Sequence, residues 1–224
     1  MSDFLEVLSN YDILGAYWIN LSLTFFAAIF SLIIGTILAM MRIAPVSSLR
    51  FAGTTYVTLV RNTPLTIIVV FAVLVLWPVL GVQFSETFSI NFFWLAVVAL
   101  SVYHASFMCE ALRSGINTVP LGQAEAARAI GLPFLSAARL VILPQAFRGA
   151  VAPLGNTLIA LVKNTTVAAA ASVPEVSILM KEMLDQNGNY VLPIFLTIAA
   201  GFVIIVIPVG LAVTYLSQRL AVSR

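Results

Sequence analysis

The long uncharged stretches of this sequence leave it few possible folds. Residues 13–41 carry no charged side chain, and residues 186–218 form a second run of the same kind. Each run is longer than the roughly 20 residues that a helix needs to cross the hydrocarbon of a bilayer. Since 61% of the residues are hydrophobic and only 9% are charged, an ordinary soluble domain is excluded. The sequence predicts an all-α membrane protein.

Three more apolar stretches raise the number of predicted membrane-spanning helices to five. They cover about residues 64–85, 92–112 and 150–171, the last interrupted by Lys163. Between the first and second spans, residues 42–61 form a mixed segment with three arginines and a proline. No internal repeat or second domain is visible, so residues 1–224 are predicted to form a single transmembrane domain.

The basic residues predict the orientation of these spans, because cytoplasmic loops carry an excess of Lys and Arg near the span ends. With five spans, only Lys181 falls on one side of the membrane. Nine arginines fall on the other: Arg42, Arg50, Arg61, Arg113, Arg128, Arg139, Arg148, Arg219 and Arg224. We therefore expect the N-terminus outside, and the C-terminus and the polar segment 122–144 in the cytoplasm.

The polar segment 122–144 has the pattern of two helices joined by a corner. Residues 123–130 are rich in strong helix formers, and Gly131 stands where a helix would end in the left-handed conformation. Pro133 suits the first turn of a second helix, and Pro144 predicts its end. A helix of 8 to 10 residues is marginal alone, so we expect it to pack against another surface.

This segment resembles the EAA loop of ABC importer permeases. The resemblance rests on Glu125, Ala126 and Ala127, on Gly131 four residues later, and on the final Leu143-Pro144. It implies the fold of a type I ABC importer permease, with a cytoplasmic coupling loop at about residues 120–145. The first helix of the loop would dock into a cleft on a separate ATPase subunit. An ordinary amphipathic loop is the alternative.

Other motifs are similar to those of polar amino-acid permeases. Residues 61–65 resemble the Arg-Gly-Thr-Pro-Leu element, with Asn62 in the place of glycine. Residues 110–116 resemble the Glu-x-x-Arg-x-Gly-Ile element, and residues 153–166 resemble the Pro-x-x-Asn and Lys-x-Thr-Ser pattern. The chain is also similar to permeases of glutamate uptake systems. The resemblance implies a prokaryotic cell-membrane protein.

No residue pattern in the chain predicts an enzyme. There is no Gly-Lys-Ser/Thr phosphate loop, no cluster with metal-ligand spacing, and no Ser-His-Asp arrangement, since His104 is the one histidine. Catalytic and metal sites are therefore not expected. If ATP drives this protein, ATP and magnesium bind to a partner chain.

Polar residues inside the predicted spans are candidates for a substrate path, because ionisable groups there are costly. Lys163 lies about 12 residues past Val151, roughly 18 Å along a helix, near the middle of the bilayer. It either contacts substrate or serves as a structural link. His104 is at a similar predicted depth, where a hydrogen-bonded packing role is the alternative. Three neighbours share the span of Lys163: Asn156, Asn164 and Thr165.

Two further predictions concern the inner end of the third span and the solute. Glu110 and Arg113 are three residues apart, so we expect a local ion pair, with gating as a second possible role. A path lined by Lys163 and His104 without an acidic residue favours an anionic or zwitterionic solute. Glutamate is the first expectation, and glutamine is the main alternative.

The family resemblance also implies partners. It implies two ATP-binding subunits, a second permease chain that is either identical or different, an extracellular solute-binding protein, a small amino-acid substrate and membrane lipid, with no nucleic acid. Two other classes remain open from the residues alone. A proton-coupled secondary amino-acid transporter would explain an intramembrane lysine and histidine, but such folds usually contain repeats. A membrane scaffold without transport activity is the other.

Overall fold

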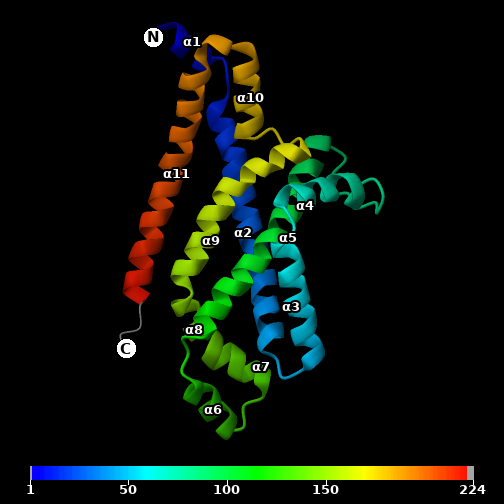
Figure 1. Cartoon of the computed structure of the whole chain (residues 1–224), viewed down its shortest axis with the longest axis vertical. Helices are drawn as coiled ribbons and strands as arrows, with labels where there is room; N and C mark the ends of the chain where they lie inside the picture. The colour runs from blue at the N-terminus through cyan, green and yellow to red at the C-terminus, as the bar shows by residue number, and fades with distance from the viewer. Residues whose placement is uncertain (1, 221–224) are drawn as a thin grey trace. The chain divides into compact units, whose positions relative to one another are not determined.

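A computed structural model describes residues 2–220, and every element in that range is helical (Figure 1). The elements in chain order are α1 (Ser2–Ser9), α2 (Ile13–Ile43), α3 (Ser47–Arg61), α4 (Leu65–Phe71), η1 (Ala72–Leu76), α5 (Phe88–Ile116), α6 (Leu121–Ala129), α7 (Phe134–Ala137), η2 (Ala138–Ile142), α8 (Leu143–Gly149), α9 (Val151–Asn164), η3 (Thr165–Ala171), α10 (Val176–Gln186), η4 (Gly188–Tyr190) and α11 (Val191–Leu220).

Three of these elements are continuous helices long and apolar enough to cross a membrane. They are α2, α5 and the segment Gly188–Leu220, with mean hydropathies of 2.4, 1.7 and 2.7. Two bent pairs of helices pass the same test together. Ser47–Arg61 with Leu65–Leu76 bends by 102°, and Phe134–Gly149 with Val151–Ala171 bends by 65°. By length and composition the described residues thus hold three spans, or up to five if each bent pair is one span. The five-span arrangement stays a prediction.

The helix α3 was missed in the sequence, where residues 42–61 looked like a mixed segment. Its arginines lie near its ends, and its inner face is small and apolar, with Gly53 and Val57 buried. A side chain at position 53 would press against Arg42 and Met41 of α2. The sequence did not reveal this helix because its arginines make the segment look polar. Near a helix end, a long basic side chain reaches water while its stem stays on apolar surface.

The contacts divide the chain into two compact units, each assembled from three stretches. The first unit comprises Met1–Ala28, Pro64–Leu100 and Ala160–Ile207. Its core includes Tyr17 of α2, Val176 of α10 and Ile198 of α11. The Tyr17 hydroxyl donates a hydrogen bond to the Ile198 carbonyl, and its ring meets Phe202 edge to face at 5.4 Å. Within this unit η3 also packs against α4.

The second unit comprises Ile29–Thr63, Ser101–Ile159 and Pro208–Arg224. Its core gathers apolar side chains from α2, α3 and α5, and Cys109 is fully buried there as a packing residue. Gly35 of α2 lies so close to α5 that a side chain would clash with Met108 and the Ala105 carbonyl. Ser31 and Ala39, one turn to either side of Gly35, are also buried, so the small residues of this part of α2 serve packing inside the chain.

Candidate functional site

The helix α6 and the corner after it have the predicted local shape. The helix covers Leu121–Ala129, and Gly131 follows with a φ of +83°. The Leu132 N–H donates to the Ala127 carbonyl at 3.1 Å, which satisfies a carbonyl at the helix end. No atom lies within 4 Å of a side chain built at Gly131. Backbone conformation, rather than lack of space, is therefore what calls for glycine here.

Two proline predictions in this segment were wrong. Pro133 is the extended residue before α7 rather than part of its first turn. Pro144 does not end the second helix, because it lies in the first turn of α8, which runs on to Gly149. The turn before it is the π-helical η2, and a widened turn of this kind can absorb a missing hydrogen bond. The chain breaks later, at Ala150.

The predicted coupling residues divide into an outer and an inner set. Glu125 and Ala126 are exposed, whereas Ala127 is 4% exposed. Within its unit, α6 packs against α7 and η2. One face of α6, which contains Ala127, therefore packs against the rest of the unit. The other face, which carries the Glu125 carboxylate, is exposed and available for contact with another chain.

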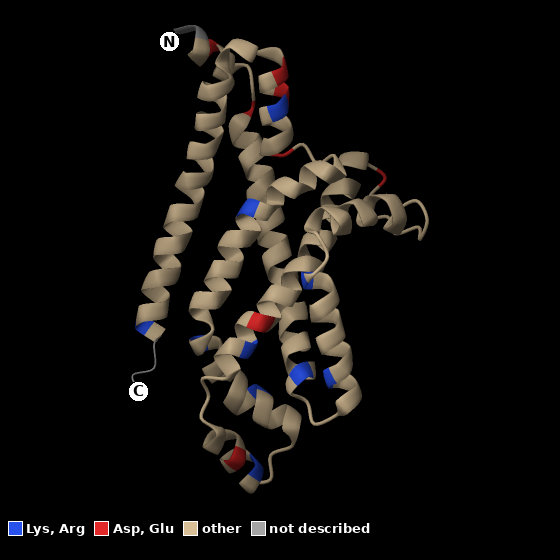
Figure 2. Cartoon of the chain, in the orientation of Figure 1, with Lys and Arg blue, Asp and Glu red and all other residues tan. Residues whose placement is uncertain are grey.

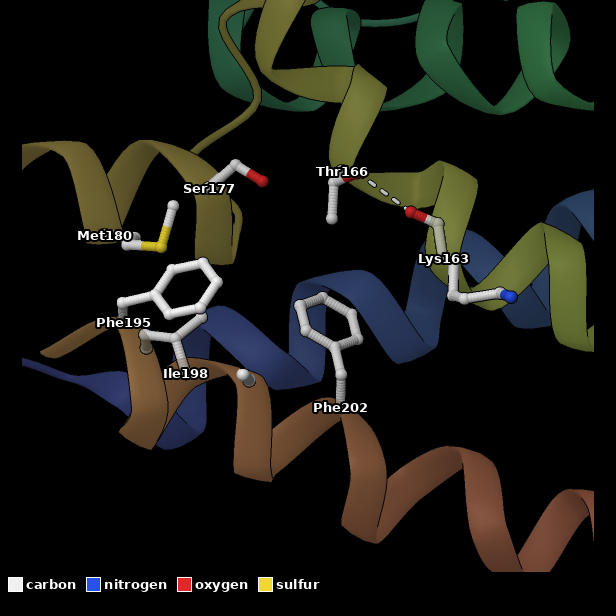
Figure 3. Close-up of a pocket in the computed structure, with 8 residues that line it drawn as sticks. Lys163, Thr166, Ser177, Met180, Phe195, Ile198 and Phe202 are labelled. Carbon is white, nitrogen blue, oxygen red and sulfur yellow. Dashed lines mark hydrogen bonds between the residues drawn. The ribbon is translucent and has the colours of Figure 1, made fainter. Parts of the chain in front are cut away.

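Lys163 lines a pocket of about 370 Å³ in the first unit, a volume within the roughly 300–1,000 Å³ of small-molecule sites. The pocket is bounded by Lys163, Thr166, Ser177, Met180, Phe195, Ile198, Ala199 and Phe202. Figure 3 shows the Lys163 side chain extending away from Met180 and Ser177, so its ammonium group lies at the margin. The Thr166 hydroxyl donates to the Lys163 carbonyl at 2.8 Å.

Thr165, next to this pocket, belongs to a buried polar cluster that the sequence did not predict. The Asn20 amide of α2 donates to the Thr165 hydroxyl and to the Glu175 carboxylate, both at 2.9 Å. Its carbonyl oxygen accepts from the Val176 N–H at 3.1 Å. Glu175 accepts a further bond from the Ser177 N–H at 2.9 Å and so caps the start of α10. The cluster joins α2, η3 and α10.

Asn20 and Glu175 are 2% and 0% exposed, and each left a weak signal in the sequence. Asn20 is the one amide side chain in the uncharged run 13–41. Glu175 precedes the 11-residue helix α10, in the stretch 173–190, which resembles a polar loop in the sequence because it carries four charged residues. Neither signal reveals that the two side chains meet, since 155 residues separate them.

His104 and Asn156 belong to the second unit, whereas Lys163, Asn164 and Thr165 belong to the first. His104 is 1% exposed, and its ring meets the Tyr103 ring edge to face at 5.3 Å and lies tilted 6.1 Å from the Phe107 ring. This environment fits the packing role that was the alternative for this histidine. Asn156 is exposed. The only candidate path residue that lines the pocket described above is Lys163.

Glu110 has two partners in addition to the predicted Arg113. Its carboxylate lies 3.9 Å from Arg113 and 3.7 Å from Arg61, but its hydrogen-bonded partner is Arg42 of α2 at 2.5 Å. The Arg42 side chain is only 10% exposed, against 48% for Arg113. The ion pair expected from sequence spacing is therefore present, and the stronger contact joins α5 to α2. The Arg61 guanidinium also stacks over the Phe107 ring, 5.3 Å from its centre.

The buried Glu175 predicts a pH dependence of stability. Burial raises its pKa above the ordinary 4.5, outweighing the bonds from Ser177 and Asn20 that lower it. The folded state then binds more protons than the unfolded state, so the free energy of unfolding should fall as pH rises from about 4.5 through the raised pKa. Glu175→Gln cannot ionise and should flatten this slope, measured by thermal unfolding in detergent between about pH 4.5 and 8.

The matched control is Glu182→Gln, which removes an exposed carboxylate from the same helix α10. Its unfolding should keep the pH slope of the unmodified protein. An unchanged slope in Glu175→Gln would contradict the assignment of the slope to Glu175.

The chain is similar to known transport proteins over nearly its whole length. Residues 31–222 match the family described as binding-protein-dependent transport system inner membrane component. The glutamate transport system permease protein GluC of Corynebacterium glutamicum is 48% identical over 218 residues, covering 95% of this chain and 96% of that protein. The probable glutamine ABC transporter permease protein GlnM of Bacillus subtilis is 32% identical and covers 86% of each chain.

Solved structures show the same fold. A chain of an amino acid ABC transporter crystal structure matches with a TM-score of 0.78 at 22% identity, over 98% of this chain and 96% of that one. A chain of the MetNI methionine ABC transporter in an inward-facing conformation matches with a TM-score of 0.73. The chain therefore belongs to the binding-protein-dependent transport system inner membrane components, and it is a permease rather than an enzyme.

Proposed function

We propose that this chain is the permease subunit of an ATP-driven importer of glutamate or another acidic amino acid. The observation that carries the proposal is the 48% identity to a glutamate transport system permease along 95% of this chain. A second glutamate permease, from Corynebacterium efficiens, is 46% identical over the same share of this chain. The identity to the glutamine permease of Bacillus subtilis is lower, 32%.

The chemistry of the first unit supports an anionic solute. Lys163 is a cation at the margin of a pocket that also carries the hydroxyls of Thr166 and Ser177. A cation in an apolar setting favours a carboxylate over a second cation. The buried carboxylate of Glu175 is bonded to Asn20 and Ser177, which leaves Lys163 to meet the solute. Its role as a path residue, with Asn156, Asn164 and Thr165, is part of this proposal.

An assembly with separate energy-coupling chains follows from this function. We infer two ATPase chains that bind ATP and magnesium, a second permease chain, and an external solute-binding protein. The helix α6 is the element offered to the ATPase, since it is attached through Ala127 and exposes Glu125 and Ala126. A proton-coupled transporter would leave this exposed helix without a role.

The distribution of charge between the two units supports the proposed orientation (Figure 2). Of the described Lys and Arg residues, only Lys163 and Lys181 belong to the first unit. Of the described carboxylates, only Glu110 and Glu125 belong to the second. Cytoplasmic segments carry the excess of Lys and Arg. We therefore assign the basic ends of the second unit, α6 and the C-terminus to the cytoplasm, and α1 to the outside.

Uptake of labelled amino acids tests the substrate. Proteoliposomes with the permease, the ATPase chain and the binding protein should accumulate glutamate in preference to arginine or lysine. Lys163→Met should lower glutamate uptake roughly tenfold or more, as expected from losing a charged hydrogen bond of about 1.5–3 kcal/mol, while basal ATPase activity persists. Lys181→Met removes the other lysine, which is exposed on α10, and should leave uptake unchanged. A preference for basic amino acids, or full uptake by Lys163→Met, would refute the acidic substrate.

Two substitutions at Gly131 test the coupling helix. Because the position has a φ of +83° and open space around it, Gly131→Val should be strained through the backbone alone, by about 1–2 kcal/mol or more. Gly131→Asn should be tolerated, since asparagine enters the left-handed region more readily. We expect normal membrane insertion in both variants, with loss of ATPase co-purification and of uptake in Gly131→Val only. Equal behaviour of the two variants would argue against the corner as the element that positions α6.

Cysteine labelling tests the orientation. In a Cys109→Ala background, Ser9→Cys and Gln218→Cys place single thiols at exposed positions near the two ends of the chain. A membrane-impermeant maleimide should label position 9 in intact cells and position 218 only after permeabilisation, because the two ends are assigned to opposite sides. Labelling of position 218 in intact cells would overturn the assignment.

A further inference from the structure

The second unit contains an apolar groove that shares no lining residue with the pocket around Lys163. It has a volume of about 610 Å³ and every side chain that lines it is apolar. One wall is the end of α2 with Met40 and Met41, and another is the turn and the start of α3 with Val46 and Leu49. The third wall is the start of α7 with Phe134 and Leu135. Figure 1 shows α7 beside the turn between α2 and α3.

The groove is open, and several of the apolar side chains that line it are exposed. Leu135 is 63% exposed, Val46 is 48% exposed and Leu49 is 42% exposed. Apolar side chains gathered at one place on a surface indicate a site for another apolar molecule.

The groove continues an exposed apolar stripe of a helix that is long enough to span a membrane. Ile33 and Ile37 of α2 are 53% and 54% exposed and lie four residues apart, so they share one face. Met41, which lines the groove, lies four residues further along the same helix. Because α2 is long and apolar enough to cross a bilayer, hydrocarbon chains that cover Ile33 and Ile37 can extend into the groove without crossing polar surface.

One arginine contacts the edge of the groove, and a second stands about one helical turn from a residue that lines it. The Arg50 guanidinium donates to the carbonyl of Ala44, which lines the groove, at 2.8 Å. Arg139 is exposed and stands four residues after Leu135 in the continuous α7–η2 segment, on the same side of the helix. Within the described residues, neither arginine forms an ion pair with a carboxylate. The rim is therefore cationic while the groove is wholly apolar.

We propose that this groove binds an anionic phospholipid of the leaflet that faces the ATPase. One acyl chain lies between Met41, Val46 and Phe134, and the phosphate contacts Arg50 and Arg139. The depth of the groove in the membrane suits a phospholipid. The turn at the end of a membrane-length helix lies at the boundary between hydrocarbon and headgroups, where arginine side chains reach phosphate. Since α6 packs against α7 and η2, the bound lipid steadies the base on which the coupling helix rests. The choice of leaflet and this last consequence rest on the proposed coupling role of α6, whereas the binding of an anionic lipid to the groove does not.

The test is lipid retention by the purified permease, measured by native mass spectrometry in detergent with equal amounts of phosphatidylglycerol and phosphatidylcholine. The unmodified chain should retain phosphatidylglycerol preferentially. A basic residue near an anionic headgroup contributes about 1 kcal/mol, which is roughly fivefold in binding. The double variant Arg50→Gln/Arg139→Gln should therefore reduce the preference for phosphatidylglycerol roughly 25-fold. The control Arg148→Gln/Arg219→Gln, which removes two exposed arginines of the same unit, should retain it.

Val46→Trp separates the groove from the rim, because it fills the groove at a half-exposed position and keeps both arginines. It should abolish the retained phosphatidylglycerol. Four outcomes would overturn the proposal: equal retention of the two lipids by the unmodified chain, an equal loss in the control pair, full retention in Val46→Trp, or release of the lipid when the ATPase chain binds. None of these measurements involves transport, and the first three use the permease alone, so a failed substrate or orientation assignment leaves those three interpretable.

Discussion

Hydrocarbon offers the backbone no hydrogen-bonding partner, and the rest of this structure follows from that constraint. Every described element is helical, because a helix satisfies its own N–H and C=O groups. At two departures from the regular α-helix, another element or a side chain lies against the changed backbone. In the first unit η3 packs on α4 and Asn20 bonds to its first residue, Thr165. In the second unit the wide turns of η2 precede Pro144 and carry the helix through it.

Each unit is tied together by one carboxylate in a different environment. Glu175 is fully buried and bonded to neutral donors from Asn20 and the Ser177 backbone. Glu110 is partly exposed and surrounded by the guanidinium groups of Arg42, Arg61 and Arg113. The buried Glu175 carboxyl is costly to ionise, and its bonds suit a contact that stays fixed. The charge of Glu110 is balanced by several arginines, which can exchange as its partners. A transporter needs both kinds of contact, because its helices must hold together while a path opens and closes.

The sequence predicted local features well where one residue type carries the geometry. Gly131 ends α6 because few other residues accept a positive φ, and this could be read from the residue itself. Pro144 misled for the opposite reason, since a proline ends a helix only if nothing compensates its missing N–H. The π-helical turn that compensates it depends on how α7, η2 and α8 pack. The helix α3 was missed because its arginines obscured the small inner face around Gly53 that fits against α2.

Sequence alone determined the class of this protein: uncharged runs that span a bilayer, a polar insert with a glycine corner, and the motifs of amino-acid permeases. These features are local, and their physics acts within about twenty residues. Tertiary structure alone decided which polar groups meet. The pairing of Asn20 with Glu175, the choice of Arg42 over Arg113 as the close partner of Glu110, and the groove between α2, α3 and α7 all join residues far apart in the chain. Such contacts depend on how helices pack, because a buried polar group binds the partner that packing brings within reach.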